Sequence, residues 1–541
     1  MHRRHFLQQT VMGAASLSSV APAFGQSPLA QEPQRISSAT IAVGDEVVER
    51  SVDDLRRALE TGQLTTRTLT QSYLRRIDAV DRQGAGLNSV IELNPDALDI
   101  ADRLDTERKA GRVRGPLHGI PVLIKDNIDT ADGMKTTAGS LALVDAHPLL
   151  DAGIVTRLRE AGAVLLGKTN LSEWANFRSE NSTSGWSGRG GLTRNPYALD
   201  RNACGSSSGS GAATAASLCA VAVGTETDGS IICPSSRCGL VGIKPTVGLV
   251  SRSGIIPISA TQDTAGPMAR TVADAAALLH VLAGPDPRDA ATKGQTLAKD
   301  YREYLQKDAL QGRRIGVMRN FFGFDARVDA LMEDAIKAAE AAGATIVDKA
   351  NLPTRGQFGD AELAILLYEF KAGLGAYLAT LGPSAPMKTL ADVIAFNEAH
   401  AKEEMPYFGQ ELFIKAQAKG PLTDKAYLMA KAKAARLSRT EGLDRVFTTK
   451  KVDALLAPSG GPAWLTDLVN GDYGTGGSSG PAAVAGYPSI TVPAGFVRGL
   501  PVGVSFIGPA WSEARLIGIA YAYEQQTKLR RAPQYLPGAL V

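Results

Sequence analysis

The sequence predicts an α/β fold built as one large domain. Short apolar runs that suit buried strands alternate with segments whose apolar residues recur at helical spacing, a pattern typical of α/β sheets. The chain has 541 residues, of which 44% are hydrophobic, so it can bury a sizeable core. Neither an internal repeat nor a linker-like stretch divides the sequence, and we therefore expect residues 51–535 to form a single domain.

The first half of this domain is expected to begin with helices and then to alternate strands with helices. Ser51 is followed by Asp53 and Asp54, acids that stabilise the positive end of a helix dipole, so a helix begins there. The expected helices cover about 51–62, 66–80, 95–111 and 154–160, and the expected strands cover 90–93, 122–124 and 163–166. Two buried strands thus lead into lysines, Lys125 and Lys168.

Residues 203–239 form the stretch around which the rest of the chain is organised. Two Gly/Ser-rich turns, one with Ser206 and one with Ser230, bracket an Ala-rich helical segment and the apolar run 220–223. Such a unit returns the chain on itself, so we expect the two turns to face each other. Their hydroxyl groups would then lie beside exposed backbone N–H groups, as acyl-transfer chemistry requires.

The second half is expected to be more helical. Residues 253–270 predict a turn-rich connection into a helix over 273–283, and 328–450 are dominated by helix signals. Further apolar, strand-like runs lie at 315–318, 452–457 and 489–492, and residues 471–480 are expected to form a Gly/Ser-rich loop.

The N-terminus predicts an export signal rather than part of the fold. Arg3 and Arg4 precede a weakly apolar run that is too short to span a bilayer, which is typical of the twin-arginine route. We assign residues 1–26 to this signal and 27–50 to an extended polar arm, and expect a periplasmic or secreted protein. No membrane association is expected after the signal is removed.

Charge and cysteine content narrow the possible partners. The 58 basic and 55 acidic residues give a net charge of only +3, which offers no reason to expect nucleic acid as a partner. The four cysteines include no C-x-x-C pair, so a zinc site is not expected. We interpret them as small apolar residues packed near the site, with a Cys204–Cys233 or another bridge as the alternative.

Three chemistries compete for the Gly/Ser-rich turns. Phosphate binding is not indicated, because the sequence lacks the G-x-x-x-x-G-K-[ST] pattern. A nucleophile elbow formally matches G-x-S-x-G at Ser206, but the polar residues 195–202 before it contain Pro196 and suit no strand. The domain also holds few histidines for such an elbow, namely His118, His147, His280 and His400. A serine activated by a lysine remains, and spacing alone does not choose between Lys125 and Lys168.

Four motifs carry a family resemblance that makes this choice. They are G-I-P-V-L-I-K-D-N-I-D around Lys125, C-G-S-S-S-G-S-G around Ser206, G-T-E-T-D-G-S around Ser230 and Q-D-T-A-G-P-M-A-R at 262–270. The sequence resembles the amidase signature family through these motifs, over about residues 50–530. The resemblance implies one domain with a central mixed β-sheet covered by helices on both faces, with 328–450 as its more variable part.

The resemblance also implies the roles of individual residues. Ser230 is expected to be the nucleophile, Ser206 the proton relay on a cis peptide and Lys125 the base, which must be neutral and is favoured in that form by burial. The backbone amides of Thr227, Asp228, Gly229 and Ser230 are expected to form the oxyanion hole, with Ser207 and the Asp228 side chain in support. No metal and no organic cofactor are implied.

Within the family, three further segments resemble bacterial peptide amidases. These are N-L-S-E-W-A-N-F-R at 170–178, L-L-Y-E-F-K-A-G-L at 366–374 and A-Y-A-Y-E-Q at 520–525. The implied activity is hydrolysis of the C-terminal carboxamide of peptides by a monomer or simple homodimer. The alternatives are an amidase or aryl-acylamidase for small non-peptide amides, the glutaminase component of a tRNA amidotransferase, and a binding protein on an inactive amidase scaffold.

Overall fold

The computed structural model describes residues 44–540. The predicted export signal (1–26) and most of the predicted arm (27–50) lie outside the described residues, so both remain predictions. The last part of the arm contains a 3-10 turn, Asp45–Val47, whose Val47 is buried. The next helix begins as expected, because Ser51 and Asp54 form a reciprocal capping box.

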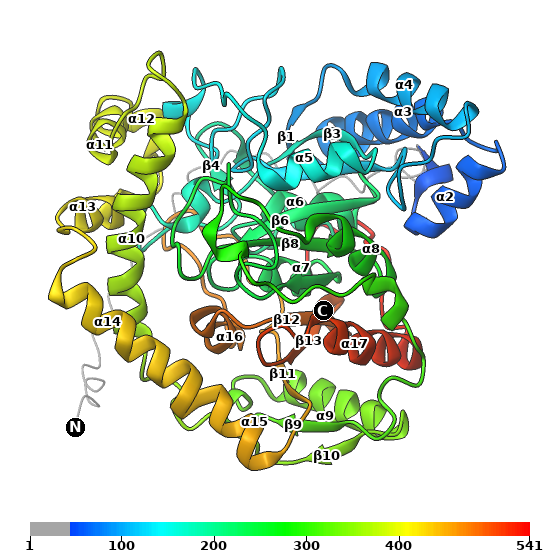
Figure 1. The fold of residues 1–541 in the computed structure, drawn as a ribbon, viewed down its shortest axis with the longest axis vertical. Helices are drawn as coiled ribbons and strands as arrows, with labels where there is room; N and C mark the ends of the chain where they lie inside the picture. Colours follow the sequence, from blue (N-terminus) through cyan, green and yellow to red (C-terminus); the bar gives the residue numbers. More distant parts are fainter. Residues whose placement is uncertain (1–43, 541) are drawn as a thin grey trace, which may run out of the picture. The chain divides into compact units, whose positions relative to one another are not determined.

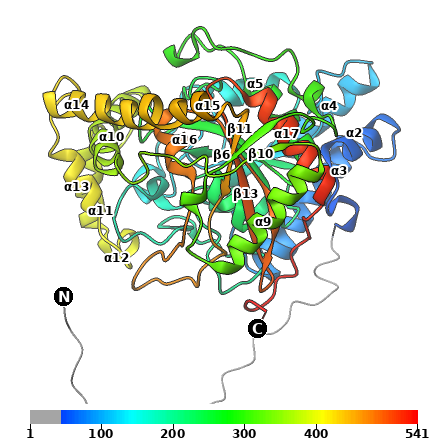
Figure 2. The same ribbon diagram turned by 90° about the horizontal axis from the view of Figure 1, so that it is seen from below.

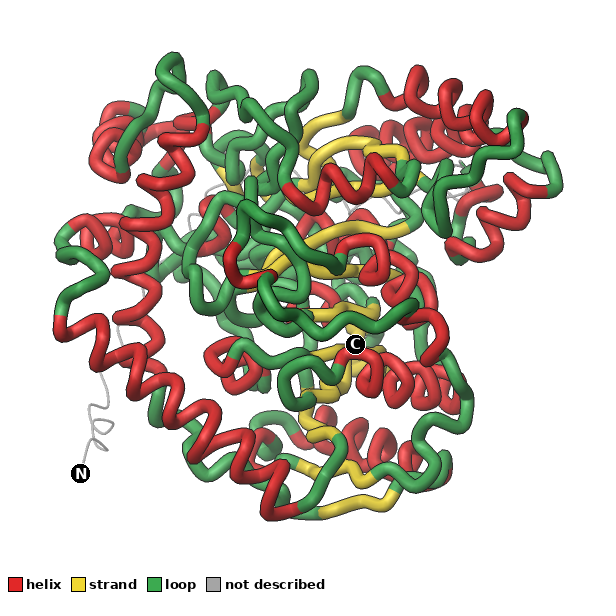
Figure 3. The backbone as a smooth tube through the Cα atoms, in the orientation of Figure 1, coloured by secondary structure: helices red, strands yellow, loops and turns green. Residues whose placement is uncertain are grey.

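An eleven-stranded sheet runs through the described part of the chain (Figures 1 and 3). Its strand order is β1-β3-β2-β6-β8-β7-β12-β13-β11-β9-β10. The bounds are β1 Val90–Leu93, β2 Pro121–Lys125, β3 Val164–Thr169, β6 Val221–Glu226, β7 Val241–Lys244, β8 Thr264–Ala269, β9 Arg314–Val317, β10 Thr345–Val347, β11 Ala454–Pro458, β12 Ser489–Val497 and β13 Leu500–Ile507. A separate two-stranded sheet pairs β4, Trp186–Ser187, with β5, Gly191–Leu192.

The large sheet is mixed, as the family resemblance implies. β2 pairs in parallel with β3 and β6, and β9 pairs in parallel with β10 and β11. The strands between these two groups pair antiparallel. The parallel group brings the ends of β2 and β6 to the same edge of the sheet, where Lys125 and residues 227–230 follow.

Helices pack on both faces of the sheet. The α-helices of residues 44–540 are α2 Val52–Glu60, α3 Thr66–Arg76, α4 Ala97–Lys109, α5 Gly153–Glu160, α6 Ser208–Ala215, α7 Ile232–Arg237, α8 Val272–Leu282, α9 Ala326–Ala341, α10 Gly359–Thr380, α11 Leu390–Ala399, α12 Ala401–Glu404, α13 Glu411–Gln417, α14 Lys425–Ala435, α15 Asp444–Lys450, α16 Ser479–Ala485 and α17 Glu513–Thr527. Figure 2 shows α9 and α17 on one side of β11 and β13, and α15 and α16 on the other.

Successive side chains of β11 pack into two different hydrophobic clusters. Leu456 belongs to the core cluster that contains Leu516 of α17, whereas its neighbours Leu455 and Ala457 belong to the cluster that contains Ala482 of α16. Successive side chains of a strand point to opposite faces of the sheet, so a continuous apolar run is required where both faces are covered.

The helical region lies mainly over residues 359–450, where α10 contacts α11, α13 and α14. By length and composition α10 is apolar enough to cross a membrane. Its Glu369 is buried, however, and accepts hydrogen bonds from Ser259, Thr261 and Tyr427, as in a core helix that is tied to its neighbours.

One expectation about secondary structure is wrong. Residues 253–270 are not only a turn-rich connection, because Thr264–Ala269 is a buried strand between β6 and β7. Gly266 and Pro267 conceal this strand, which is stabilised by pairing on both sides. The region 328–450 is dominated by helices, as expected, and also contains the short strand Thr345–Val347, which pairs with β9.

Candidate active site

Lys125 lies at the buried end of β2, and its amine contacts the loop that contains Ser206. Its side chain is fully buried, and Nζ lies 2.7 Å from Ser206 Oγ. Nζ also lies 2.9 Å from Thr225 Oγ1 and 3.3 Å from the Thr225 carbonyl oxygen. A neutral amine has two N–H groups and one lone pair, so it can donate to both Thr225 oxygens and accept the Ser206 hydroxyl proton.

The surroundings of Lys125 favour this neutral form. Burial lowers the pKa of Lys125 from its usual 10.5 to about 7, although the nearby Asp263 and Glu226 act in the opposite direction. Within residues 44–540, Lys125 forms no ion pair. Both nearby carboxylates accept hydrogen bonds from other groups: Asp263 from the Thr227 hydroxyl, and Glu226 from backbone amides.

The Ser206 loop is held between β6 and the Ser230 loop. The peptide between Gly205 and Ser206 is cis, as the resemblance implies. Ser207 Oγ accepts from Thr225 N–H at 3.2 Å and is 3.0 Å from the Thr225 carbonyl oxygen. The Ser207 N–H donates to the Ser230 carbonyl at 3.3 Å, so the two serine turns are in direct contact.

The Ser230 loop is fixed from both ends. Glu226 Oε2 accepts the N–H groups of Ile231 and Ile232 at 2.7 and 2.9 Å, and the Gly229 carbonyl accepts the Cys233 N–H at 2.7 Å. Gly229 has φ +79°, a left-handed conformation that glycine adopts without strain. The amides of residues 227–230 donate no hydrogen bond to any other residue in the described chain, which leaves them open to an external acceptor.

Comparison with known proteins now identifies the family. The amidase family model matches residues 68–517. The crystal structure of native peptide amidase from Stenotrophomonas maltophilia is 54% identical, covers 90% of this chain and 98% of its own, and has a TM-score of 0.86. This chain belongs to the amidase signature family. It is therefore an amidase that hydrolyses amide bonds.

Two curated relatives show how widely the family extends. A probable amidase of Arabidopsis thaliana is 42% identical over 501 residues, which cover 91% of this chain and 92% of the relative. The glutamyl-tRNA(Gln) amidotransferase of Symbiobacterium thermophilum has a component chain that is 36% identical over 495 residues, which cover 88% of this chain and 97% of the relative.

The cysteines of this amidase differ from our preferred interpretation. Cys204 and Cys233 are not separate apolar residues but form a disulfide with a sequence separation of 29. This bridge joins the Ser206 turn to the first turn after Ser230. Cys219 and Cys238 are free and buried, as small apolar residues would be. The spacing of the four cysteines could not decide the pairing, because connectivity depends on how the loops meet in space.

Residues considered as alternatives have other partners in this amidase. Lys168 Nζ donates to the Ile128 carbonyl at 2.6 Å and to Thr136 Oγ1 at 2.9 Å, so it joins two loop segments. His118 contacts the Leu104 carbonyl through Nε2 at 3.1 Å. Neither side chain forms a hydrogen bond with Ser206 or Ser230 in the described structure.

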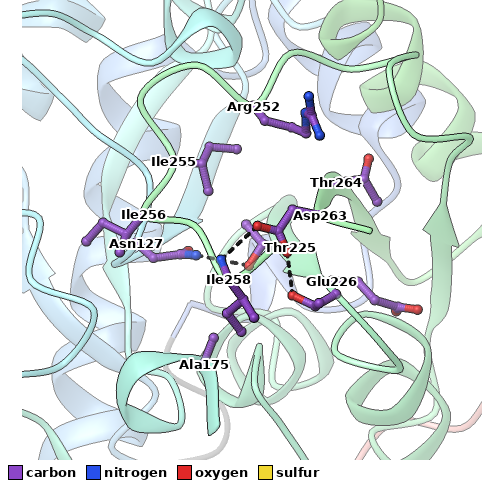
Figure 4. A pocket seen from close by; sticks show the side chains of 11 residues that line it. Asn127, Ala175, Thr225, Glu226, Arg252, Ile255, Ile256, Ile258, Asp263 and Thr264 are labelled. Atoms are coloured by element: carbon purple, nitrogen blue, oxygen red, sulfur yellow. Dashed lines mark hydrogen bonds between the residues drawn. The ribbon is translucent and has the colours of Figure 1, made fainter. Parts of the chain in front are cut away.

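Several site residues were missed by sequence reasoning. Thr225 supplies two of the three contacts of Lys125 and also accepts from Asn127 Nδ2 at 3.1 Å. Asp263 accepts from Thr227 Oγ1 at 2.6 Å and from the Ile258 N–H at 2.8 Å. Figure 4 shows Asn127, Thr225, Ile258 and Asp263 around a small cavity, which Thr227 of the Ser230 loop also lines. Asp263 lies in the Q-D-T motif quoted above, which was the available signal.

The described residues contain no group of three or more His, Cys, Asp or Glu side chains arranged to hold a metal ion.

Proposed function

We propose that this amidase hydrolyses the C-terminal carboxamide of peptides through a Ser-Ser-Lys relay and an acyl-enzyme intermediate. The observation that carries the mechanism is the 2.7 Å contact between the buried Lys125 Nζ and Ser206 Oγ. A lysine without a carboxylate partner and with a pKa of about 7 can act as a base near neutral pH.

In the first step, Ser230 Oγ attacks the carboxamide carbon. The Ser230 proton passes to Ser206 as the Ser206 proton passes to Lys125, which becomes an ammonium. The oxyanion that forms would be stabilised by the open backbone amides of residues 227–230, each donor contributing about 3 kcal/mol to the transition state. Ser207 would support the relay by holding the two turns together through its backbone and side chain.

In the second step, the tetrahedral intermediate collapses and its C–N bond breaks. The proton returns from Lys125 through Ser206 to the departing nitrogen, which leaves as ammonia. Water then attacks the acyl-enzyme, with the same relay acting as base, and releases the peptide carboxylate.

The proposal of a peptide substrate has separate support. The three segments at 170–178, 366–374 and 520–525 resemble bacterial peptide amidases, and the solved peptide amidase is 54% identical over 90% of this chain. A second crystal structure, of a peptide amidase with the competitive inhibitor chymostatin, has a TM-score of 0.88 with this chain.

Ammonia release tests the substrate class. We expect activity on alanyl-phenylalanine amide and loss of that activity in Ser230→Ala, with folding retained. Hydrolysis of small aliphatic or aryl amides alone, with none of peptide amides, would refute the peptide proposal and favour the alternative.

Export through the twin-arginine route and a monomeric or simple dimeric state are part of the same proposal. Export would separate this protein from a cytoplasmic role like that of an amidotransferase component. Fractionation of expressing cells and light scattering of the purified protein test these two points.

A further inference from the structure

A pair of carboxyl groups lies beside the nucleophile loop, and the proposed mechanism does not use it. Asp228 is two residues before Ser230 and keeps a solvent-exposed face. Its carboxyl group forms a hydrogen bond with that of Glu362, which is in the first turn of α10. Desolvation by the surrounding protein, together with the neighbouring Glu362 carboxyl, raises the pKa of Asp228. Burial also raises the pKa of Glu362, and the Ser479 side chain is a second partner of the Asp228 carboxyl group.

A buried side-chain amide, that of Gln262, lies beside this carboxyl pair and has one atom without a hydrogen-bond partner among the described residues. Gln262 is 1% exposed, and its Nε2 donates to Glu362 Oε1 at 2.9 Å and to the Thr227 carbonyl at 3.3 Å. The Oε1 of the same amide has no hydrogen-bond partner among the described residues. Buried polar atoms normally have a partner, so the amide that is bonded to Glu362 can still accept a hydrogen bond from one more donor.

Asp228 also lies near an open groove. This groove has a volume of about 570 Å³ and apolar walls that include Phe321, Phe358 and Pro481. Gly480 forms part of the groove, and an ideal Cβ built there would lie 3.4 Å from Asp228 Oδ2 and 4.0 Å from Phe358. Asp228 therefore lies beside the wall of the groove and, in the chain, two residues from Ser230.

We infer that Asp228 and Glu362 bind the N–H group on the α-carbon next to the scissile carboxamide. This inference rests on the proposed function, because it assigns the substrate feature that the same site reads. In an amino-acid amide this group is an ammonium, and in a longer peptide amide it is a neutral backbone N–H. A carboxylate accepts from both, whereas a simple carboxamide has no such donor.

Three substrates that share one side chain test the inference. They are phenylalanine amide, alanyl-phenylalanine amide and 3-phenylpropanamide, which lacks the α-nitrogen. In Asp228→Ala we expect kcat/KM for the first two to fall about 10- to 100-fold more than for the third. Asp360→Ala is the matched control, since Asp360 is an exposed acid in the same turn of α10 and should leave all three rates unchanged.

The outcomes separate the possible roles. An equal loss on all three substrates, or no loss, overturns the inference, because an effect on the loop alone cannot depend on the α-nitrogen. Glu362→Ala is judged by the same criterion and replaces Asp228→Ala if that variant does not fold. Asp228→Asn keeps an acceptor but removes charge, so it should impair phenylalanine amide more than alanyl-phenylalanine amide. Wild-type protein that hydrolyses only 3-phenylpropanamide would instead refute the proposed function.

Discussion

Replacing Lys125 by methionine is expected to abolish catalysis and, at the same time, to stabilise the fold. Lys125 is fully buried, and its pKa falls from 10.5 to about 7. An unfolded lysine keeps its proton below pH 10.5, so the unfolded state binds more protons than the folded state between pH 7 and 10.5. The free energy of unfolding therefore rises with pH through this window, and at pH 7 the lysine lowers it.

The magnitude follows from the shift. A difference of 3.5 pKa units corresponds to about 5 kcal/mol, of which about 4 kcal/mol applies at pH 7, where half of the folded molecules are protonated. Methionine removes this cost but also removes the contacts with Ser206 and Thr225, which contribute about 1–2 kcal/mol. We expect a net gain of about 2–3 kcal/mol at pH 7.

Calorimetry and ammonia release together check this prediction. For a chain of this length, about 1 kcal/mol shifts Tm by about 1 °C, so Tm should rise by about 2–3 °C at pH 7. Above pH 10 it should not rise, because the lost contacts then outweigh the remaining cost of the buried lysine. The kcat/KM should fall at least about 1,000-fold. Lys168→Met is the matched control: it should keep kcat/KM within about 10-fold. It should also gain less Tm than Lys125→Met, because Ile128 and Thr136 lose their donor and the nearby Asp126 and Asp129 lose a cation. A Lys125→Met variant that stays active, or that loses more stability than Lys168→Met, would refute the reasoning.

Three further outcomes are expected. Ser206→Ala should lose at least about 100-fold in kcat, because it removes the relay, and should lower Tm by only about 1 °C, because one buried hydrogen bond is lost. Pre-steady-state ammonia release measures the loss, and a variant with full activity would exclude the relay. Replacing both Cys204 and Cys233 by alanine should lower the free energy of unfolding by about 3–4 kcal/mol, as expected for a disulfide that closes a loop of this length. Denaturant titrations measure this loss, and an unchanged unfolding midpoint would contradict the prediction. The wild-type kcat/KM should rise about tenfold from pH 6 toward a plateau above pH 8, since only the neutral form of Lys125 is a base; a rate that is flat across pH 5–8 would show that another group controls it.

Local sequence patterns predicted the elements whose own residues favour a helix or a strand. The strand ending at Lys125 and the helix capped by Ser51 lie where the sequence indicates. The strand Thr264–Ala269 was missed because its small residues, glycine and proline have low strand propensity. It is a strand because β6 and β7 pair with it, a contribution that no local window contains.

In the candidate site, too, the sequence predicts some residues, whereas tertiary contacts are needed to find others. Motifs placed Lys125, Ser206 and Ser230 together, but strand ends alone left Lys168 equally suitable. The family resemblance selects Lys125, and the tertiary structure gives the physical reason, since Lys125 contacts Ser206 and Lys168 contacts loop atoms. Glu362 could not be predicted, because it reaches Asp228 from a helix far along the chain.

The protonation state of Lys125 tests the central claim most directly. The side-chain nitrogen can be titrated by NMR in Ser230→Ala protein labelled with ¹⁵N-lysine, with the signal assigned by its absence in Lys125→Arg. We predict deprotonation near pH 7. A Lys125 nitrogen that remains an ammonium up to pH 9 would contradict the mechanism.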